Sequence, residues 1–218
     1  MIKPVLVSVA FGNEYMACMR RLKESVAKFS PNSDALFYEN TLPPGAKPHS
    51  QSPYGFKIQA IQEAARISPK VVWMDCTCFL VGDPNLYFEP PRYKHLEEEG
   101  VVMAFDSNSL HGLASPNLLS AYGVSVDTCK SLHLVGGSLY VFDFTLEKCR
   151  KIFNVWAEME GKGLFSAASF PPHRWDEACM AIALHLNNSR ALSYMDSGYR
   201  CNTIVNKDHW KDHLKDHR

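Results

Sequence analysis

The chain of 218 residues is long enough for one large domain with a sizeable buried core. Its 46% hydrophobic and 21% charged residues are ordinary for a globular protein and exclude a disordered chain. The 23 Lys and Arg residues balance 23 Asp and Glu residues, so we expect neither nucleic acid nor an acidic membrane as the main partner, and an anionic substrate must be held by a local site.

The sequence carries no signal for a membrane or for secretion. No apolar run reaches the roughly 18–20 residues that a membrane helix needs. The segment MIKPVLVSVAFGNE has no small-residue cleavage pattern. The seven cysteines are odd in number and irregularly spaced, which favours a reduced compartment over a disulfide framework. We therefore expect a soluble cytoplasmic protein without a transmembrane segment.

Apolar runs alternate with amphipathic stretches along the chain, as they do in α/β sheets. In the first half we expect strands at residues 4–10, 35–38 and 71–74, and helices at 13–29 and from Pro53 to about 67. Ser52 stands before Pro53 and is predicted to cap the second helix. A Pro-, Gly- and Ser-rich loop occupies residues 41–52.

The second half continues the same alternation. We expect strands at residues 101–105, two strand segments within 132–142, a short strand at 191–194, and helices at 146–161 and 174–186. The charged, proline-containing stretch 83–99 is predicted to lie on the surface, and the tail is charged. The pattern predicts a single α/β domain in which helices flank a mixed, mostly parallel sheet.

Asp75 directly follows the apolar run VVWM at the end of a predicted strand. Ligands of open α/β sheets bind beyond the carboxyl ends of the strands. Thr77, two residues on, faces the same side of an extended chain. Their oxygens could hold Mg²⁺ or Mn²⁺, which bridge diphosphates. The alternative is that Asp75 caps a turn and that Thr77 is structural.

Two further segments could meet a phosphate or a sugar. Tyr54 to Lys57 stand where a helix begins, and helix N-termini attract phosphate, to which Lys57 adds a positive charge. The alternative is a solvated lysine on a helix that merely packs on the sheet. Gly136 and Gly137 permit close approach of a ligand or of another backbone, and the alternative is a bulge or a tight turn.

The segment His173-Arg174-Trp175-Asp176-Glu177 opens another predicted helix. Acidic residues in a first turn are favourable for the helix itself, so capping explains them without any function. The functional interpretation gives Asp176 or Glu177 the role of a general base or of a ligand for acceptor hydroxyls.

The tail repeats Lys-Asp-His every four residues, so His209, His213 and His217 would share one face of a helix. Charged termini are usually solvated. A single histidine that folds back to an active-site metal is more plausible than a zinc-binding helix. Cys76 and Cys78 form C-x-C without a second pair, so we interpret them as small buried residues and not as zinc or redox ligands.

The order of these segments resembles the GT-A glycosyltransferases of the nucleotide-diphospho-sugar transferase superfamily. The likeness is to bacterial and viral members with a PY-x-FK helix, a WLD strand end and an HR-x-D-(E/Q) helix start. It spans residues 4 to 187 through the segments VLVSVAFG, LFYEN, SPYGFK, VVWMDCT, GGSLYVF and HRWDEACMAIAL.

The resemblance implies a Rossmann-like nucleotide-binding half at about residues 1–105 and an acceptor half with the tail at about 106–218. It places Asp176 or Glu177 at the reacting centre. The residues that it implies for the donor are Phe11, Glu39, Asn40, Thr41, Tyr54, Lys57, Asp75, Thr77, Gly136 and Gly137.

Asp75 matches the first acid of the family's Asp-x-Asp, which holds Mn²⁺ or Mg²⁺ against the donor diphosphate. Thr77 replaces the second acid, which weakens the metal site. Three options follow: weaker metal binding, help from His209, or no metal, with Lys57 or a tail lysine neutralising the phosphate.

The activity that the resemblance implies is transfer of a sugar from a nucleotide-diphosphate sugar, UDP-sugar favoured, to a hydroxyl of a glycan or glycoprotein. Asp176 or Glu177 would be the base of an inverting transfer, or would orient the substrate in a retaining one. A related nucleotidyltransferase would carry a Gly-rich loop with Arg and Lys where this chain has Phe11-Gly12-Asn13-Glu14. A non-catalytic nucleotide- or carbohydrate-binding module stays open because of the Asp-x-Thr.

Overall fold

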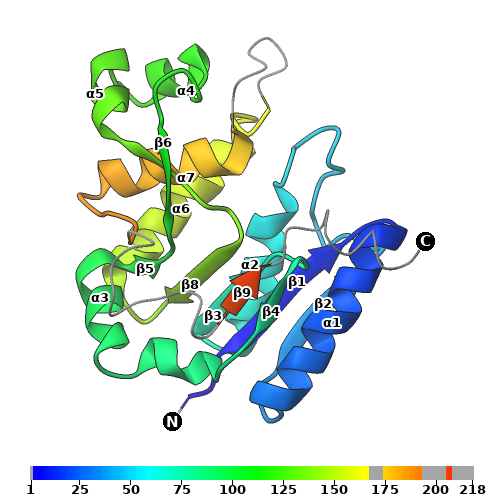
Figure 1. Cartoon of the computed structure of the whole chain (residues 1–218). Helices are drawn as coiled ribbons and strands as arrows, with labels where there is room; N and C mark the ends of the chain where they lie inside the picture. Colours follow the sequence, from blue (N-terminus) through cyan, green and yellow to red (C-terminus); the bar gives the residue numbers. More distant parts are fainter. Residues whose placement is uncertain (1, 167–173, 193–204, 208–218) are drawn as a thin grey trace.

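The computed structural model describes residues 2–166, 174–192 and 205–207 (Figure 1). Its centre is a five-stranded sheet of order β2-β1-β3-β8-β5. These strands are β1 (Val5–Ala10), β2 (Ala35–Glu39), β3 (Lys70–Met74), β5 (Val101–Val102) and β8 (Leu139–Asp143). β1 is parallel to β2 and β3, whereas β8 is antiparallel to β3 and β5. Four strands thus run one way, and the predicted mixed, mostly parallel sheet is confirmed.

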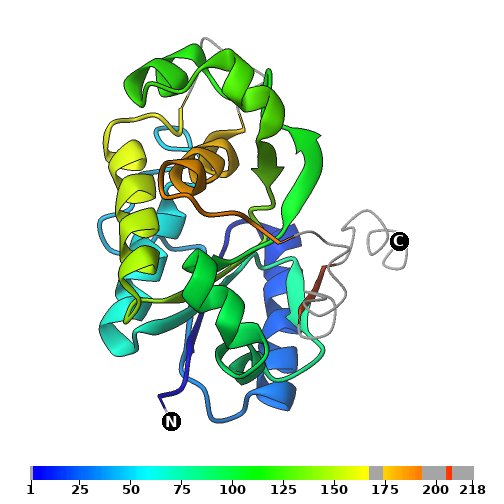
Figure 2. The same cartoon turned by 90° about the vertical axis from the view of Figure 1, so that its left-hand side faces the viewer.

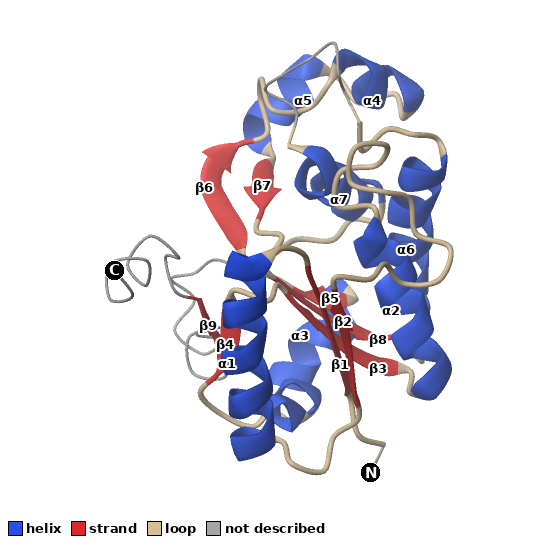
Figure 3. Ribbon diagram, turned by 90° about the vertical axis from the view of Figure 1, so that its right-hand side faces the viewer, coloured by secondary structure: helices blue, strands red, loops and turns tan. Residues whose placement is uncertain are grey.

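Both faces of the sheet are buried, because alternate side chains of each strand enter different cores. Val5, Val7 and Trp73 point into one core, and Leu6 and Met74 into the other. The first core lies under α2 (Phe56–Ile67), α6 (Glu147–Gly161) and α7 (Trp175–Leu186). The second lies under α1 (Asn13–Phe29), η1 (Pro84–Phe88) and α3 (Arg92–Glu99). Figure 3 shows α1 on one side of the sheet and α2 and α6 on the other.

Two small sheets extend this body. β6 (Phe105–Ser109) pairs with β7 (His133–Val135), and α4 (Pro116–Ala121) and α5 (Val126–Ser131) lie between them in the sequence. In Figure 2 these green elements lie at the end of the molecule remote from the N-terminus. β4 (Cys78–Leu80) pairs with β9 (Val205–Lys207) in antiparallel fashion.

Two predicted elements were placed wrongly. The second helix begins at Phe56, not at Pro53, and Ser52 does not cap it. Tyr54 has φ 60°, a left-handed conformation that cannot continue a right-handed helix, so helical geometry starts only after it. The strand predicted at 101–105 is split after Val102, because β5 pairs with β8 in the main sheet whereas β6 pairs with β7 in another.

Two other segments also differ from expectation. Residues 83–99, which were predicted to lie on the surface, form η1 and α3 and contribute Tyr87, Phe88 and Leu96 to a core. At 191–194, Leu192 makes one isolated parallel bridge with Ala104, and residues 193 and 194 lie outside the described part of the chain.

Cys76 and Cys78 are buried, as the interpretation of small buried residues predicted. Among the described residues, every helix is too short or too polar to span a lipid bilayer.

Candidate active site

The residues that follow β1, β2 and β3 meet at one edge of the sheet, because these three strands are parallel. Gly12, after β1, donates its N–H to Asn40 Oδ1, after β2, at 2.9 Å. Asp75, after β3, donates its N–H to the carbonyl of Ser138 at 2.8 Å. β8 runs in the opposite direction, so the residues before it lie at this same edge. The sheet topology therefore gathers most of the predicted site.

The ammonium of Lys57 is the centre of the charged cluster at this edge. Lys57 is only 2% exposed. Its Nζ lies 2.7 Å from Asp176 Oδ2, 2.9 Å from the Gly137 carbonyl oxygen and 3.6 Å from Asp75 Oδ1. Burial alone would lower the pKa of Lys57, but the Asp176 and Asp75 carboxylates outweigh it and hold the pKa above its usual range. The protonated form of the buried lysine is therefore favoured.

Asp176 is held from three directions and is 2% exposed. Besides Lys57, the hydroxyl of Tyr140 donates to Asp176 Oδ2 at 3.3 Å, and Trp156 Nε1 donates to the Asp176 carbonyl at 3.0 Å. Burial raises the pKa of Asp176, and the Lys57 ammonium counters that rise. These contacts fix the first turn of α7 to the core and leave Asp176 little access to a substrate.

Glu177 is the more accessible of the two acidic residues. It is partly exposed, and its Oε1 accepts the N–H of Gly137 at 3.1 Å. Burial, and then the neighbouring Asp176 charge, raise the pKa of Glu177 from 4.5 to about 7. A carboxyl group that gains or loses its proton near neutrality suits general acid–base chemistry.

Gly137 is required by close approach of its neighbours. A Cβ at this position would lie 2.9 Å from Lys57 Nζ and 3.1 Å from Glu177 Oε1. Gly137 and Ser138 form a turn before β8, so the tight-turn alternative describes this segment, and the groups that approach Gly137 are side chains of the site itself.

Asp75 lies at the rim of the cluster, with a side chain 29% exposed. Trp73 Nε1 donates to Asp75 Oδ1 at 3.3 Å, on the side where Lys57 lies. Cys78 donates its N–H to the Asp75 carbonyl at 2.8 Å, so residues 75–78 form a turn, and the extended chain predicted to place Thr77 on the same side as Asp75 is wrong. Thr77 is buried, and its carbonyl accepts from Arg21 at 2.9 Å. The lone carboxylate thus reaches solvent at the sheet edge.

Four residues predicted for the donor, Phe11, Glu39, Asn40 and Thr41, lie along the β1–β2 side of the edge. Phe11 is 38% exposed and packs edge-on against Phe56. Asn40 has φ 51° and bonds Gly12. Glu39 forms an ion pair with Lys23, 2.5 Å apart, and Thr41 is exposed. Glu39 is therefore engaged on α1.

A divalent cation at Asp75 would have the Lys57 ammonium close by, because Lys57 Nζ lies 3.6 Å from Asp75 Oδ1. The described residues contain no group of three or more His, Cys, Asp or Glu that could hold a metal. His209 lies outside the described residues.

Sequence reasoning missed three aromatic partners of the site: Trp73, Tyr140 and Trp156. Trp73 carries a usable signal, because it stands two residues before Asp75 and so shares its side of the strand. Tyr140 and Trp156 bind Asp176 from β8 and α6, and no local pattern links those segments to residue 176.

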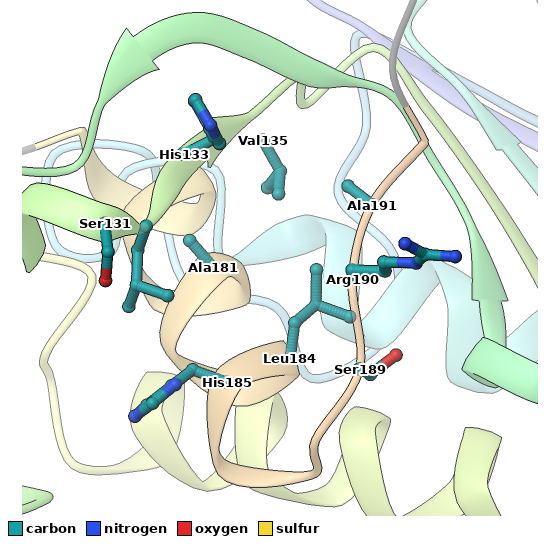
Figure 4. Close-up of a pocket in the computed structure, with 10 residues that line it drawn as sticks. Ser131, His133, Val135, Ala181, Leu184, His185, Ser189, Arg190 and Ala191 are labelled. Carbon is teal, nitrogen blue, oxygen red and sulfur yellow. The ribbon is translucent and has the colours of Figure 1, made fainter. Parts of the chain in front are cut away.

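A separate cavity of about 220 Å³ lies elsewhere in the molecule (Figure 4). Apolar side chains of β7, α7 and the segment after α7 wall it, among them Val135, Leu184 and Ala191. Leu184 is two helical turns beyond Glu177 on α7. No residue predicted for the site lines this cavity, and the charged cluster lies apart from it.

No family model and no curated protein matches the sequence. Solved structures do match. A glycosyltransferase involved in the glycosylation of the major capsid of PBCV-1 has a TM-score of 0.54 and 10% identity, over 97% of this chain and 99% of that one. Mouse xyloside xylosyltransferase 1 has a TM-score of 0.51 and 8% identity, over 90% of each chain. The chain therefore has the GT-A fold of glycosyltransferases, as its sequence predicted.

Proposed function

We propose that this chain is a glycosyltransferase that moves a sugar from a nucleotide-diphosphate sugar, UDP-sugar favoured, to a hydroxyl of a glycan or glycoprotein. One observation carries the proposal: Lys57, Asp75, Asp176 and Glu177, from three separate elements, meet at the carboxyl edge of a GT-A sheet. Burying charged groups costs desolvation free energy, and enzyme sites are where such clusters concentrate.

The donor would lie along the edge from β2 to β3. We assign the base and ribose to the side of Phe11, Asn40 and Thr41, where an exposed aromatic face and polar groups are available. The diphosphate would then lie beside Asp75. Since Lys57 is buried beneath that carboxylate, its charge acts through Asp75 and Asp176 and not by direct contact with phosphate.

Asp75, with Thr77 and His209, is our proposed ligand set for Mn²⁺ or Mg²⁺. When bound, the cation would neutralise charge on the departing diphosphate. The pairing of β4 and β9 supports the inclusion of His209. Lys207 pairs with Cys78, and Val205 pairs with Leu80. β9 therefore runs toward Cys78, which is the residue of β4 nearest to Asp75 in the sequence.

The two acidic residues of α7 would have different roles. Asp176, held by Lys57, Tyr140 and Trp156, positions the helix start. Glu177 is the group able to take a proton from the acceptor hydroxyl if the anomeric configuration inverts. In a retaining transfer the same carboxylate would orient the acceptor. The fixed first turn of α7 keeps Glu177 in place in either case.

The test is release of the nucleotide from a panel of UDP-glucose, UDP-galactose, UDP-N-acetylglucosamine and GDP-mannose, without acceptor and with Mn²⁺. We expect slow hydrolysis of one donor by the wild type, reduced by about 10²-fold or more in Glu177→Gln. Glu158→Gln, an exposed glutamate on α6, is the matched control and should hydrolyse as the wild type does. Binding of a donor without any turnover would favour the non-catalytic module.

A further inference from the structure

Two aromatic side chains lie against one another beside the charged cluster. Tyr54 precedes α2 and Trp175 opens α7, and their ring centroids are 5.4 Å apart. Both residues are partly exposed. The ring of His49 meets Tyr54 edge-on at 4.8 Å. Segments more than a hundred residues apart in the sequence thus build one aromatic surface, which we call the aromatic platform: Tyr54, Trp175 and His49.

The backbone under this platform is strained. Tyr54 has φ 60° and Trp175 has φ 39°, a left-handed region that bulky residues rarely adopt. Such conformations persist where the surrounding structure imposes them, and they concentrate at functional sites. Here both strained residues are aromatic, and their rings lie against each other.

The platform adjoins the reacting groups. The Lys57 ammonium lies 5.1 Å from the centroid of the Tyr54 ring, and the Tyr54 carbonyl accepts the Lys57 backbone N–H at 3.0 Å. Trp175 directly precedes Asp176 and Glu177. A ligand resting on the two rings would therefore have an edge directed at the carboxylates of α7.

The chemistry of the aromatic platform indicates the class of ligand that it binds. Partly exposed aromatic side chains such as these offer a rigid apolar surface with little loss of side-chain entropy. A pyranose ring has one face of C–H bonds, which packs on an aromatic ring, and hydroxyl groups around its edge, which can reach Glu177. We propose that Tyr54 and Trp175 bind the pyranose ring of the acceptor. This inference rests on the proposed function, and it moves Tyr54 from the donor to the acceptor.

Saturation-transfer NMR with methyl β-galactopyranoside, methyl β-glucopyranoside and methyl α-mannopyranoside, without nucleotide, tests direct contact. At least one pyranoside should show saturation of its ring C–H protons in the wild type. Saturation should fall about tenfold in Trp175→Leu and in Tyr54→Leu and should persist in Trp175→Phe, which keeps an aromatic face. Tyr122→Leu, a partly exposed tyrosine that packs on Lys162, is the matched control and should match the wild type.

Steady-state kinetics separate acceptor from donor. With the pyranoside that shows saturation as acceptor and the nucleotide sugar that the wild type hydrolyses as donor, Trp175→Leu should raise the pyranoside KM about tenfold while the donor KM changes by less than about threefold. A larger rise in the donor KM would overturn the assignment to the acceptor. Equal saturation in all variants would overturn the proposal that the aromatic platform binds a pyranose ring. If a pyranoside binds on the rings but no nucleotide sugar is hydrolysed by the wild type, the platform stands and the proposed function fails.

Discussion

Lys57 and Asp176 form a buried ion pair, 2.7 Å apart, between residues separated by 119 positions in the sequence. Each side chain is almost fully buried, at 3% and 2% exposure. The pair joins the first turn of α2 to the first turn of α7, and it places Glu177 and Asp75 around one ammonium. The site is therefore assembled by tertiary contacts and not within one motif.

Removal of the ammonium should destabilise the fold strongly. In Lys57→Met, Asp176 keeps a buried carboxylate without its partner, which should lower the free energy of unfolding by about 3–5 kcal/mol. Urea denaturation followed by circular dichroism measures this. Lys57→Met combined with Asp176→Asn should recover part of the loss, because the uncompensated charge is gone. A single variant that loses less than about 1 kcal/mol would refute the role of the pair.

Gly137→Ala should disrupt the site. Its methyl group would lie 2.9 Å from Lys57 Nζ and 3.1 Å from Glu177 Oε1, so one of them must move. We expect a loss of about 1–3 kcal/mol of stability and of most hydrolytic activity. Gly161→Ala is the control, since nothing lies within 4 Å of a Cβ there and the residue ends α6. The control should be neutral or slightly stabilised, and the same behaviour at Gly137 would contradict the close packing.

Glu177 should make both stability and activity depend on pH. Its folded pKa, about 7, lies above the unfolded value of 4.5, chiefly because of burial. The contribution of Glu177 to the free energy of unfolding is thus complete below pH 4.5 and is lost as the pH rises through 7. The two limits differ by about 3 kcal/mol. Glu177→Gln removes this effect, so its melting temperature should exceed that of the wild type by more at pH 8 than at pH 5.

Activity should depend on pH in the opposite direction: it should increase where the stability decreases. If Glu177 accepts a proton, kcat of the wild type rises as the pH increases through about 7, where the carboxylate forms. A profile without an inflection between pH 6 and 8 would argue against Glu177 as the base.

Local patterns predicted the regular elements well where one physical signal dominated. The helix at 13–29 has a clear apolar stripe and was predicted at its observed bounds, and the strand before Asp75 is an uninterrupted apolar run. The short helices α4 and α5 were missed although Ser115 and Ser125 cap them, with hydroxyls that accept the N–H of Leu118 and of Thr128. Six-residue helices show too little periodicity to stand out.

The sequence predicted the residues of the site better than it predicted the contacts between them. Asp75 was found because it directly follows a predicted strand. Asp176 and Glu177 were found because they stand at the start of a predicted helix. The burial of Lys57 could not be read from its sequence, because the first turn of a helix is usually solvated. The partners that bury it come from β3, β8 and α7, and only the folded chain brings them together.

The central claim is that a nucleotide diphosphate binds at Asp75 with a cation. Its most direct test is a thermal-shift panel of UDP, GDP, CMP and dTDP, with and without Mn²⁺, on the wild type and on Asp75→Ala. A nucleotide at about 100 times its Kd should add about 2.7 kcal/mol of stability. We predict a shift with UDP that grows with Mn²⁺ in the wild type and loses its Mn²⁺ dependence in folded Asp75→Ala. A flat response to every nucleotide, or an unchanged Mn²⁺ dependence in the variant, would contradict the account.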